Sequence, residues 1–222
     1  ATNNGAISLQ DVKGIGANAG SDLTVSSGTA ATSLKGIGTD INDLIVDGTG
    51  TITLTGDITT EDSTAAGDDG ATAEDGAQSY AGAVVIHGGD LTLTTGGGGA
   101  SFSSTINSQA SQARALTIAN TDGAVSVTGA IGTGTNGALG ALIIGTAEAA
   151  GNTGNITLAA IGTDSAAGAA SITVGNSRTG TLTLGGVEYF SSGAQTWEAD
   201  DFNLTGADIT IQTTDSNVTF QD

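Results

Sequence analysis

Residues 155–174 read NITLAAIGTDSAAGAASITV, and this segment contains the pattern from which we predict the fold. It contains two triplets, Ile156–Leu158 and Ile172–Val174, each with Thr between two apolar residues. An Ile-Gly turn lies between the two triplets. The alternation has the two-residue period that is typical of β-strands, so the apolar side chains face one way and the hydroxyl faces the other. Val, Ile and Thr also suit a pleated surface.

Similar triplets recur along the whole chain, with Thr, Ser or Ile at the centre. Outside the opening stretch they include Ile7–Leu9, Leu23–Val25, Leu44–Val46, Ile52–Leu54, Leu91–Leu93, Leu116–Ile118, Val125–Val127, Leu142–Ile144, Leu182–Leu184, Ile209–Ile211 and Val218–Phe220. Spacings near 16–22 residues indicate the coils of a solenoid. We therefore predict an all-β fold: a parallel β-helix (β-solenoid) that occupies residues 1–222 as one domain. About ten coils would give a rod on the order of 50 Å long.

Within each triplet the apolar side chains should enter a continuous core, as for Leu91, Leu93, Ile172 and Val174, with Thr92 and Thr173 outside. The alternative is a β-sandwich, since many short strands at regular spacing also fit that fold. Sandwiches usually have longer strands and a buried aromatic residue. Aromatic residues make up only 3% of this chain, which favours the solenoid.

The composition excludes several classes of function. The net charge is −19, with only four Lys and Arg residues, so the surface repels nucleic-acid phosphates and anionic membranes. No segment approaches the roughly 18 consecutive apolar residues of a membrane span. The absence of Cys excludes disulfides and Cys-based metal sites.

An acidic segment interrupts the triplets at residues 61–75, which contain no Val, Ile, Leu or aromatic residue. We interpret it as a loop inserted between strands. Its six carboxylates are candidates for a calcium site, because hard cations prefer several oxygen ligands; they are Glu61, Asp62, Asp68, Asp69, Glu74 and Asp75. The alternative is a solvated acidic loop. The sequence predicts no other cofactor.

A polysaccharide-active β-helix enzyme is the third hypothesis for the function of the chain. The tetrapeptide Asn120–Gly123 resembles a motif of polygalacturonases, which are β-helix enzymes that combine it with paired carboxylates and a histidine. Asp200 and Asp201 are the available carboxylates, and His87 is the only histidine. Four cationic residues are too few to hold an acidic polysaccharide, and Asn-Thr-Asp-Gly is also an ordinary turn sequence. We therefore expect no enzyme activity.

Pairs of Thr separated by one residue suggest a different binding function. They occur at Thr51, Thr53 and Thr55, at Thr92 and Thr94, and at Thr181 and Thr183. Stacked on one flat face, such pairs would resemble an ice-binding surface. The simpler interpretation is the β-propensity of Thr on an exposed strand.

A longer repeat carries a family resemblance. Residues 76–80, Gly-Ala-Gln-Ser-Tyr, recur 117 positions later as Gly-Ala-Gln-Thr-Trp at 193–197. An Asp-Leu/Ile-Thr-Leu/Ile segment and a Ser/Thr-Phe pair follow each copy. This pattern resembles the repeat tracts of large bacterial surface proteins, the filamentous-haemagglutinin-like and autotransporter-like adhesins. The resemblance implies a secreted, right-handed parallel β-helix at the cell surface.

These observations together predict an extracellular structural protein, either an adhesin stalk or a self-assembling surface-filament subunit. A surface or host glycan or protein is the partner that the resemblance implies. The ends of a solenoid expose unpaired backbone groups unless they are capped. Neither end of this sequence resembles a cap, so we also expect head-to-tail self-association. A binding module, for calcium or for ice, is the second hypothesis for the function.

Overall fold

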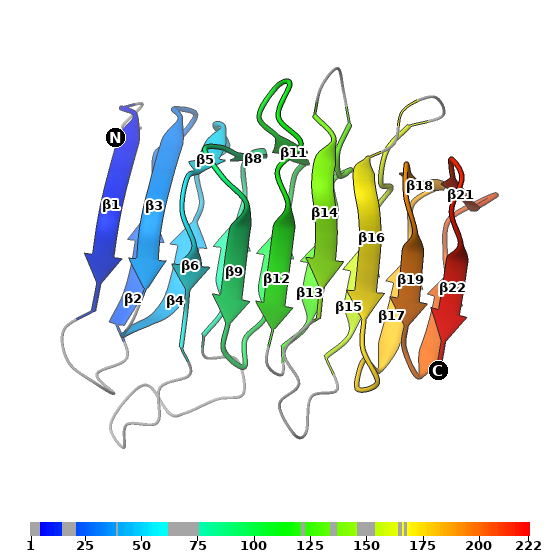
Figure 1. Ribbon diagram of the computed structural model, residues 1–222. Helices are drawn as coiled ribbons and strands as arrows, with labels where there is room; N and C mark the ends of the chain where they lie inside the picture. Colours follow the sequence, from blue (N-terminus) through cyan, green and yellow to red (C-terminus); the bar gives the residue numbers. More distant parts are fainter. Residues whose placement is uncertain are drawn as a thin grey trace.

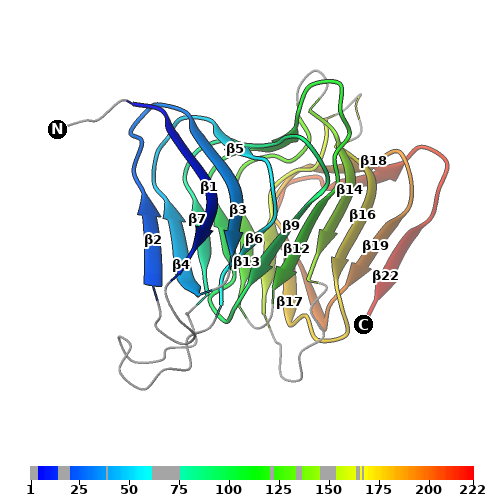
Figure 2. The ribbon, with the colours of Figure 1, turned by 60° about the vertical axis from the view of Figure 1, so that its left-hand side comes forward.

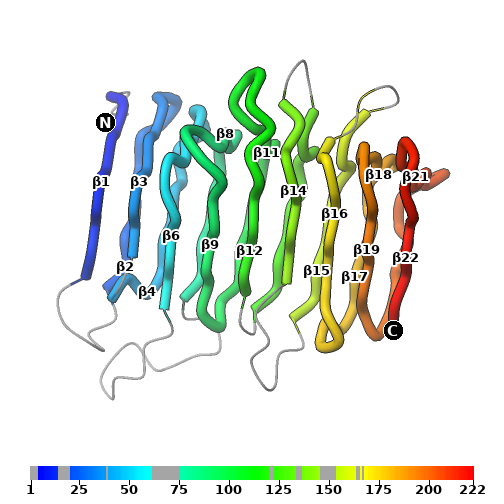
Figure 3. Tube along the Cα trace, viewed as in Figure 1, coloured from blue at the N-terminus to red at the C-terminus, as the bar shows by residue number. Residues whose placement is uncertain are grey.

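The computed structural model describes residues 5–14, 21–38, 40–61, 76–120, 123–133, 137–145, 154–163, 166 and 168–222. The chain forms a rod of stacked coils, and its termini lie at opposite ends (Figures 1 and 3). In Figure 1 the front strands run down, the back strands run up, and the coils advance from left to right. The coil is therefore right-handed, as parallel crossovers almost always are. The described residues contain strands and no helix, and the fold is the predicted parallel β-helix.

Three ladders of parallel strands run along the rod. Ladder 1 contains the amino-terminal parts of β1 (Ile7–Lys13) and β3 (Thr32–Gly38), then β5 (Ile52–Leu54), β8 (Val84–Ile86), β11 (Ile106–Ser108), the bridge residues Ile131 and Ile161, β18 (Glu188–Ser191) and β21 (Thr210–Thr213). Ladder 2 contains the carboxyl-terminal parts of β1 and β3, then β6 (Ile58–Thr59), β9 (Leu91–Thr95), β12 (Leu116–Asn120), β14 (Leu139–Ile144), β16 (Ala169–Gly175), β19 (Gln195–Glu198) and β22 (Val218–Gln221). Ladder 3 contains β2 (Ser21–Val25), β4 (Ile41–Val46), β7 (Gln78–Tyr80), β10 (Ala100–Phe102), β13 (Val125–Val127), β15 (Ile156–Leu158), β17 (Thr181–Leu184) and β20 (Asp201–Leu204).

Ladders 1 and 2 belong to one bent sheet and ladder 3 forms the sheet opposite (Figure 2). Each coil visits the ladders in the order 1, 2, 3. The described strands make eight complete coils and the first two ladders of a ninth. At about 4.8 Å per coil the rod is about 42 Å long, somewhat shorter than the ten coils expected.

The expected spacing of coils was partly wrong. Ile7–Leu9 and Leu23–Val25, which the sequence suggested as successive coils, lie in different ladders of the same coil. The residue that stacks on Ile7 is Thr32, and the residue that stacks on Thr32 is Ile52. Consecutive triplets therefore alternate between ladders, and a coil uses two or three strands. The coil that contains the predicted acidic insertion is longer than its neighbours, because the residue that stacks on Ile52 is Val84.

The core is continuous from coil to coil, because the triplets point as predicted. Leu91, Leu93, Ile172 and Val174 are at most 3% exposed, whereas Thr173 is exposed and Thr92 half-buried. All pairings between named strands are parallel, which excludes the antiparallel sandwich.

Aromatic residues contribute more to the core than the composition suggested. The rings of Tyr80 and Phe102 stack at 4.9 Å between centroids, and those of Tyr189 and Trp197 meet edge to face at 5.6 Å. All four are at most 1% exposed. They complete a buried core whose other hydrophobic members are aliphatic.

Candidate functional site

The outward side of ladder 3 presents one column of side chains in register through all eight coils. Its members are Thr24, Ile45, Ser79, Ser101, Ser126, Thr157, Thr183 and Asn203. Neighbours lie one strand apart, about 4.8 Å. None is charged, although the chain carries a net charge of −19. The carboxylates of the described chain are therefore kept off this line of the surface.

Ladder 2 presents a second column, in which Thr predominates. It contains Thr92, Thr117, Ile143, Thr173, Thr196 and Thr219. The neighbouring column does not continue the pairing, because Thr94 stacks on Ala119. Each of these faces therefore offers one row of hydroxyls.

The Thr pairs of the sequence do not share one face. Thr53 lies on β5 of ladder 1, Thr92 and Thr94 lie on β9 of ladder 2, and Thr181 and Thr183 lie on β17 of ladder 3. The fold thus distributes these pairs around the rod instead of gathering them on one flat surface.

The repeated Gly-Ala-Gln segment provides a buried polar connection between coils. Gln78 Nε2 donates to the carbonyl oxygens of Ile58 at 3.3 Å and Thr94 at 2.8 Å. These carbonyls belong to two successive coils of ladder 2. Gln78 Oε1 accepts a hydrogen bond from the Tyr80 hydroxyl at 2.8 Å. The side chain is 1% exposed, so its polar atoms depend on these partners.

The second copy of the segment makes the same connection on a different ladder. Gln195 Nε2 donates to the carbonyls of Tyr189 at 3.0 Å and Gln212 at 2.7 Å, on two successive coils of ladder 1. Gln195 Oε1 accepts from Trp197 Nε1 at 3.1 Å. The first copy lies on ladder 3 and the second on ladder 2. The repeated segment therefore forms the same local hydrogen-bond pattern on two different ladders.

Burial explains the ionisation behaviour of both tyrosines. Desolvation raises the pKa of Tyr80 far above its ordinary value. Desolvation also raises the pKa of Tyr189 to about 12, although a hydrogen bond from the Gly186 backbone N–H opposes the shift. The Tyr189 hydroxyl donates to the Leu158 carbonyl at 2.9 Å. Both hydroxyls are thus structural donors, that of Tyr80 to its own strand and that of Tyr189 to an earlier coil.

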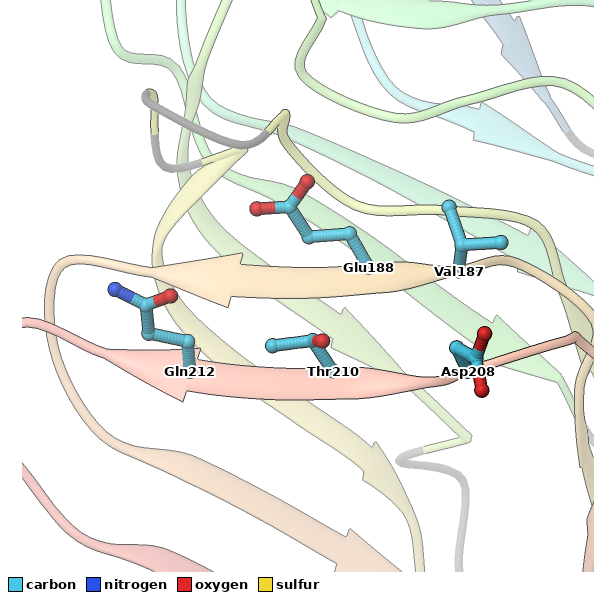
Figure 4. A pocket seen from close by; sticks show the side chains of 5 residues that line it. All are labelled: Val187, Glu188, Asp208, Thr210 and Gln212. Atoms are coloured by element: carbon cyan, nitrogen blue, oxygen red, sulfur yellow. The ribbon is translucent and has the colours of Figure 1, made fainter.

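A pocket of about 240 Å³ lies on the outer side of ladder 1, between β18 and β21 (Figure 4). Its lining is Val187, Glu188, Asp208, Thr210 and Gln212. Glu188 is 7% exposed, whereas Val187 is 56% exposed. The volume is below the range of about 300–1,000 Å³ that is usual for small-molecule sites. A second hollow of about 220 Å³ is lined by Ser111, Gln112, Ala113 and Ala138.

Most of the predicted calcium ligands lie outside the described residues: Asp62, Asp68, Asp69, Glu74 and Asp75. Glu61 is described. It is exposed, and its backbone N–H donates to the Ile41 carbonyl at 2.9 Å. Among the described residues, no group of three or more His, Asp or Glu side chains is gathered as a metal site would require.

The residues of the enzyme-like motif are not brought together. Asn120 points inward, and its Nδ2 donates to the Gly123 carbonyl at 2.7 Å, as a turn residue would; Thr121 and Asp122 lie outside the described residues. His87 follows β8 in the fourth coil, and Asp200 precedes β20 in the eighth. Four coils separate them by on the order of 19 Å along the rod.

Apolar side chains are exposed on the last coils. Leu204 is 59%, Phe220 50% and Val218 37% exposed. The rings of Phe202 and Phe220 meet edge to face at 5.3 Å, so ladders 2 and 3 are in contact at this end. At the opposite end Ile7 is half-buried against the core.

The sequence did not reveal which triplets stack, and so it missed the two outward columns and the pocket. A Ser or Thr between two apolar residues identifies an outward position. Which outward residues become neighbours depends on the lengths of the coils, and these lengths differ along the chain. The step from Thr32 to Ile52 is shorter in sequence than the step from Ile52 to Val84, although each spans one coil.

Comparison with known proteins found no family model, no curated protein and no solved structure that matches the chain. In the described part of the chain, no helix has the length and apolar character needed to cross a membrane.

Proposed function

We propose that this chain is a non-enzymatic, extracellular structural protein, either the stalk of a bacterial surface adhesin or the subunit of a self-assembling surface filament. The observation that supports this most is the continuous parallel pairing of ladder 3 from β2 to β20. Ladders 1 and 2 run beside it over the same length.

Continuous ladders suit a mechanical role. Each inner strand is hydrogen-bonded to a neighbour on both sides, so bending the rod must disturb many backbone hydrogen bonds at once. Stacked repeats that bury one shared core behave as a quasi-one-dimensional object whose length follows from the number of repeats. A rod of this kind holds whatever is attached to its two ends at a fixed distance.

The carboxylates also serve the stacking of coils. Asp57 Oδ1 accepts the backbone N–H of Thr92 at 2.8 Å, and Asp90 Oδ1 accepts that of Ala115 at 2.9 Å. Each bond joins one coil to the next. A carboxylate keeps its negative charge when it accepts such a bond, so the sides of the rod stay negative, which opposes lateral association of copies.

The β20–β22 end exposes apolar side chains in the described chain, and both forms of the proposal account for them. Leu204, Val218 and Phe220 form an apolar surface on strands with a free edge in the described chain. A further coil would bury it. In the stalk form that coil belongs to the same polypeptide, and in the filament form to another copy. The uncharged outward columns suit the contact with a surface glycan or protein that an adhesin makes.

Sedimentation of purified Ala1–Asp222 over a range of protein and salt concentrations tests the filament form. We expect mass to increase with protein concentration, and more strongly in high salt, where repulsion is screened. Phe220→Asp should suppress the increase because it places a charge on the apolar end. Ser101→Asp, the control, adds the same charge to the side of the rod and should leave association intact. A strict monomer throughout would eliminate the filament and leave the stalk.

Ice binding is the second candidate, favoured by the Thr column of ladder 2. Its five hydroxyls and one Ile repeat at every coil on the outer face. Thermal hysteresis of the purified protein is the test: a gap between melting and freezing points that Thr117→Lys removes would support it. No gap at millimolar protein would exclude it.

A further inference from the structure

The pocket on the outer side of ladder 1 is formed by two neighbouring strands that stack in register (Figure 4). Glu188 of β18 pairs with Thr210 of β21. Tyr189, the next residue of β18, enters the core, so Glu188 faces outward. The backbone N–H of Thr210 donates to the Val187 carbonyl at 2.9 Å. The pairing of the two strands therefore fixes the side chains of the pocket relative to one another.

The lining combines charged, polar and apolar groups in one small volume. Glu188 and Asp208 contribute carboxylates, Thr210 contributes a hydroxyl, and Gln212 contributes an amide. Val187 contributes an exposed apolar surface. Glu188 is buried, whereas Asp208, Thr210 and Gln212 are exposed, so a carboxylate lies at the base and further hydrogen-bonding groups lie around it. A few polar groups beside an apolar contact are typical of a ligand site.

The two carboxylates lie in a part of the chain without cationic side chains. Residues 179–222 contain seven Asp and Glu and no Lys, Arg or His. Arg178 lies in the turn between β16 of ladder 2 and β17 of ladder 3, away from ladder 1. Arg114 precedes β12, three coils before β18. The pocket therefore repels anionic ligands and attracts cationic ones.

The other lining groups decide between kinds of cation. A metal ion would leave the apolar surface of Val187 unused, and among the described residues no third His, Asp or Glu joins the two carboxylates. A Lys side chain offers only donors, so the N–H groups of the Gln212 amide would gain no acceptor. An amino sugar has an ammonium group for the carboxylates, hydroxyls for Thr210 and Gln212, and C–H groups for Val187.

We propose that this pocket binds one amino-sugar residue of a surface glycan, with its amine free and protonated. The volume of about 240 Å³, small for a drug-sized ligand, suits a single sugar ring. The inference rests on the adhesin form of the proposed function, for which it names a contact site and a ligand class. The site lies on the side of the rod, so a ligand there does not require self-association.

Nuclear magnetic resonance titration of isotope-labelled Ala1–Asp222 tests the pocket, with glucosamine as the probe at a pH where its amine is protonated. We expect chemical-shift changes confined to β18, β21 and their entry turns. N-acetylglucosamine, whose nitrogen is neutral, should bind at least tenfold more weakly. Glucuronate, which is anionic, should cause no change at these residues.

Charge-removing variants test the assigned groups. Glu188→Gln keeps the size of the side chain and should weaken glucosamine binding at least tenfold. Asp208→Asn tests the second carboxylate at an exposed position, and Asn tolerates the left-handed backbone there, where φ is 52°. It too should weaken binding. Asp201→Asn, the matched control, removes the same charge from ladder 3 and should leave binding unchanged.

The outcomes separate the pocket from the proposed function. No change at β18 and β21 with millimolar glucosamine would overturn the pocket, whereas assembly seen by sedimentation would still support the structural role. Equal binding of glucosamine and N-acetylglucosamine would overturn the ammonium assignment. Saturation of the same residues by calcium chloride in place of glucosamine would assign the pocket to a metal ion and overturn the proposal. Hydrolysis of a nitrophenyl glucosaminide would overturn the non-enzymatic function and retain the pocket.

Discussion

The Tyr80 hydroxyl donates to Gln78 Oε1 at 2.8 Å, and the amide group of the same Gln78 holds the carbonyls of two successive coils. The aromatic ring thus orients an amide that connects coils. Trp197 and Gln195 repeat this relationship 117 positions later. The identity of the aromatic residue changes between copies, but a donor two residues after the Gln is kept.

Removal of that donor should cost stability. Tyr80→Phe keeps the ring and leaves Gln78 Oε1 buried without a donor, which should lower the free energy of unfolding by about 1–3 kcal/mol. Ser79→Ala is the matched control, since Ser79 faces outward and should change it by less than about 0.5 kcal/mol. Urea unfolding of both variants gives the comparison. Equal effects would contradict the assigned role of the hydroxyl.

The alternation within triplets predicts a large contrast between neighbouring positions. Ile172→Asp would bury an unpaired carboxylate at a site that is 1% exposed, so the protein should be unfolded or destabilised by more than about 4 kcal/mol. Thr173→Asp on the exposed side of the same strand should cost less than about 1 kcal/mol. Circular dichroism and thermal unfolding separate the two. A folded, stable Ile172→Asp protein would contradict the core.

Glycine is required at Gly175 for two independent reasons. Its φ is 85°, and a Cβ there would collide with the Glu198 carbonyl oxygen. Gly175→Ala should therefore lower the free energy of unfolding by at least about 2 kcal/mol. Gly89→Ala is the control, because no atom lies within 4 Å of the added Cβ. Its effect, measured by the same unfolding experiment, should stay within about 1 kcal/mol.

Alkaline pH should unfold the protein through its two tyrosines. Burial raises the pKa of Tyr189 to about 12, from an ordinary value of 10.0. The folded chain therefore retains this proton at pH values where the unfolded chain loses it. The resulting stability is complete below about pH 10 and disappears as the pH rises from there to about 12. Tyrosinate absorbance and circular dichroism should change together; gradual ionisation of a chain that stays folded would contradict the burial.

The period-two triplets were sufficient to predict the class of fold and the inward direction of residues such as Leu91 and Ile172. They were not sufficient to predict stacking. Ile7–Leu9 and Leu23–Val25 look like successive coils but lie on different ladders of one coil, because turns of different length separate the ladders. A local pattern specifies which way a side chain faces, whereas register depends on the length of every turn before it.

The same limit applied to the candidate sites. The Thr pairs at Thr53, Thr92 and Thr183 are alike in sequence yet belong to three ladders. The pocket between β18 and β21 combines Glu188 with Gln212, which are distant in the sequence and meet only through the register of coils eight and nine. No local motif carries that information.

End-to-end assembly of the rods should be visible by cryo-electron microscopy of concentrated Ala1–Asp222. At about 1 M salt, where the Debye length is about 3 Å, we predict unbranched filaments with strands perpendicular to the long axis, a coil repeat of about 4.8 Å and a subunit repeat of about 42 Å. Separate particles no longer than about 42 Å at every concentration, or filaments in which rods pack side by side, would contradict end-to-end assembly.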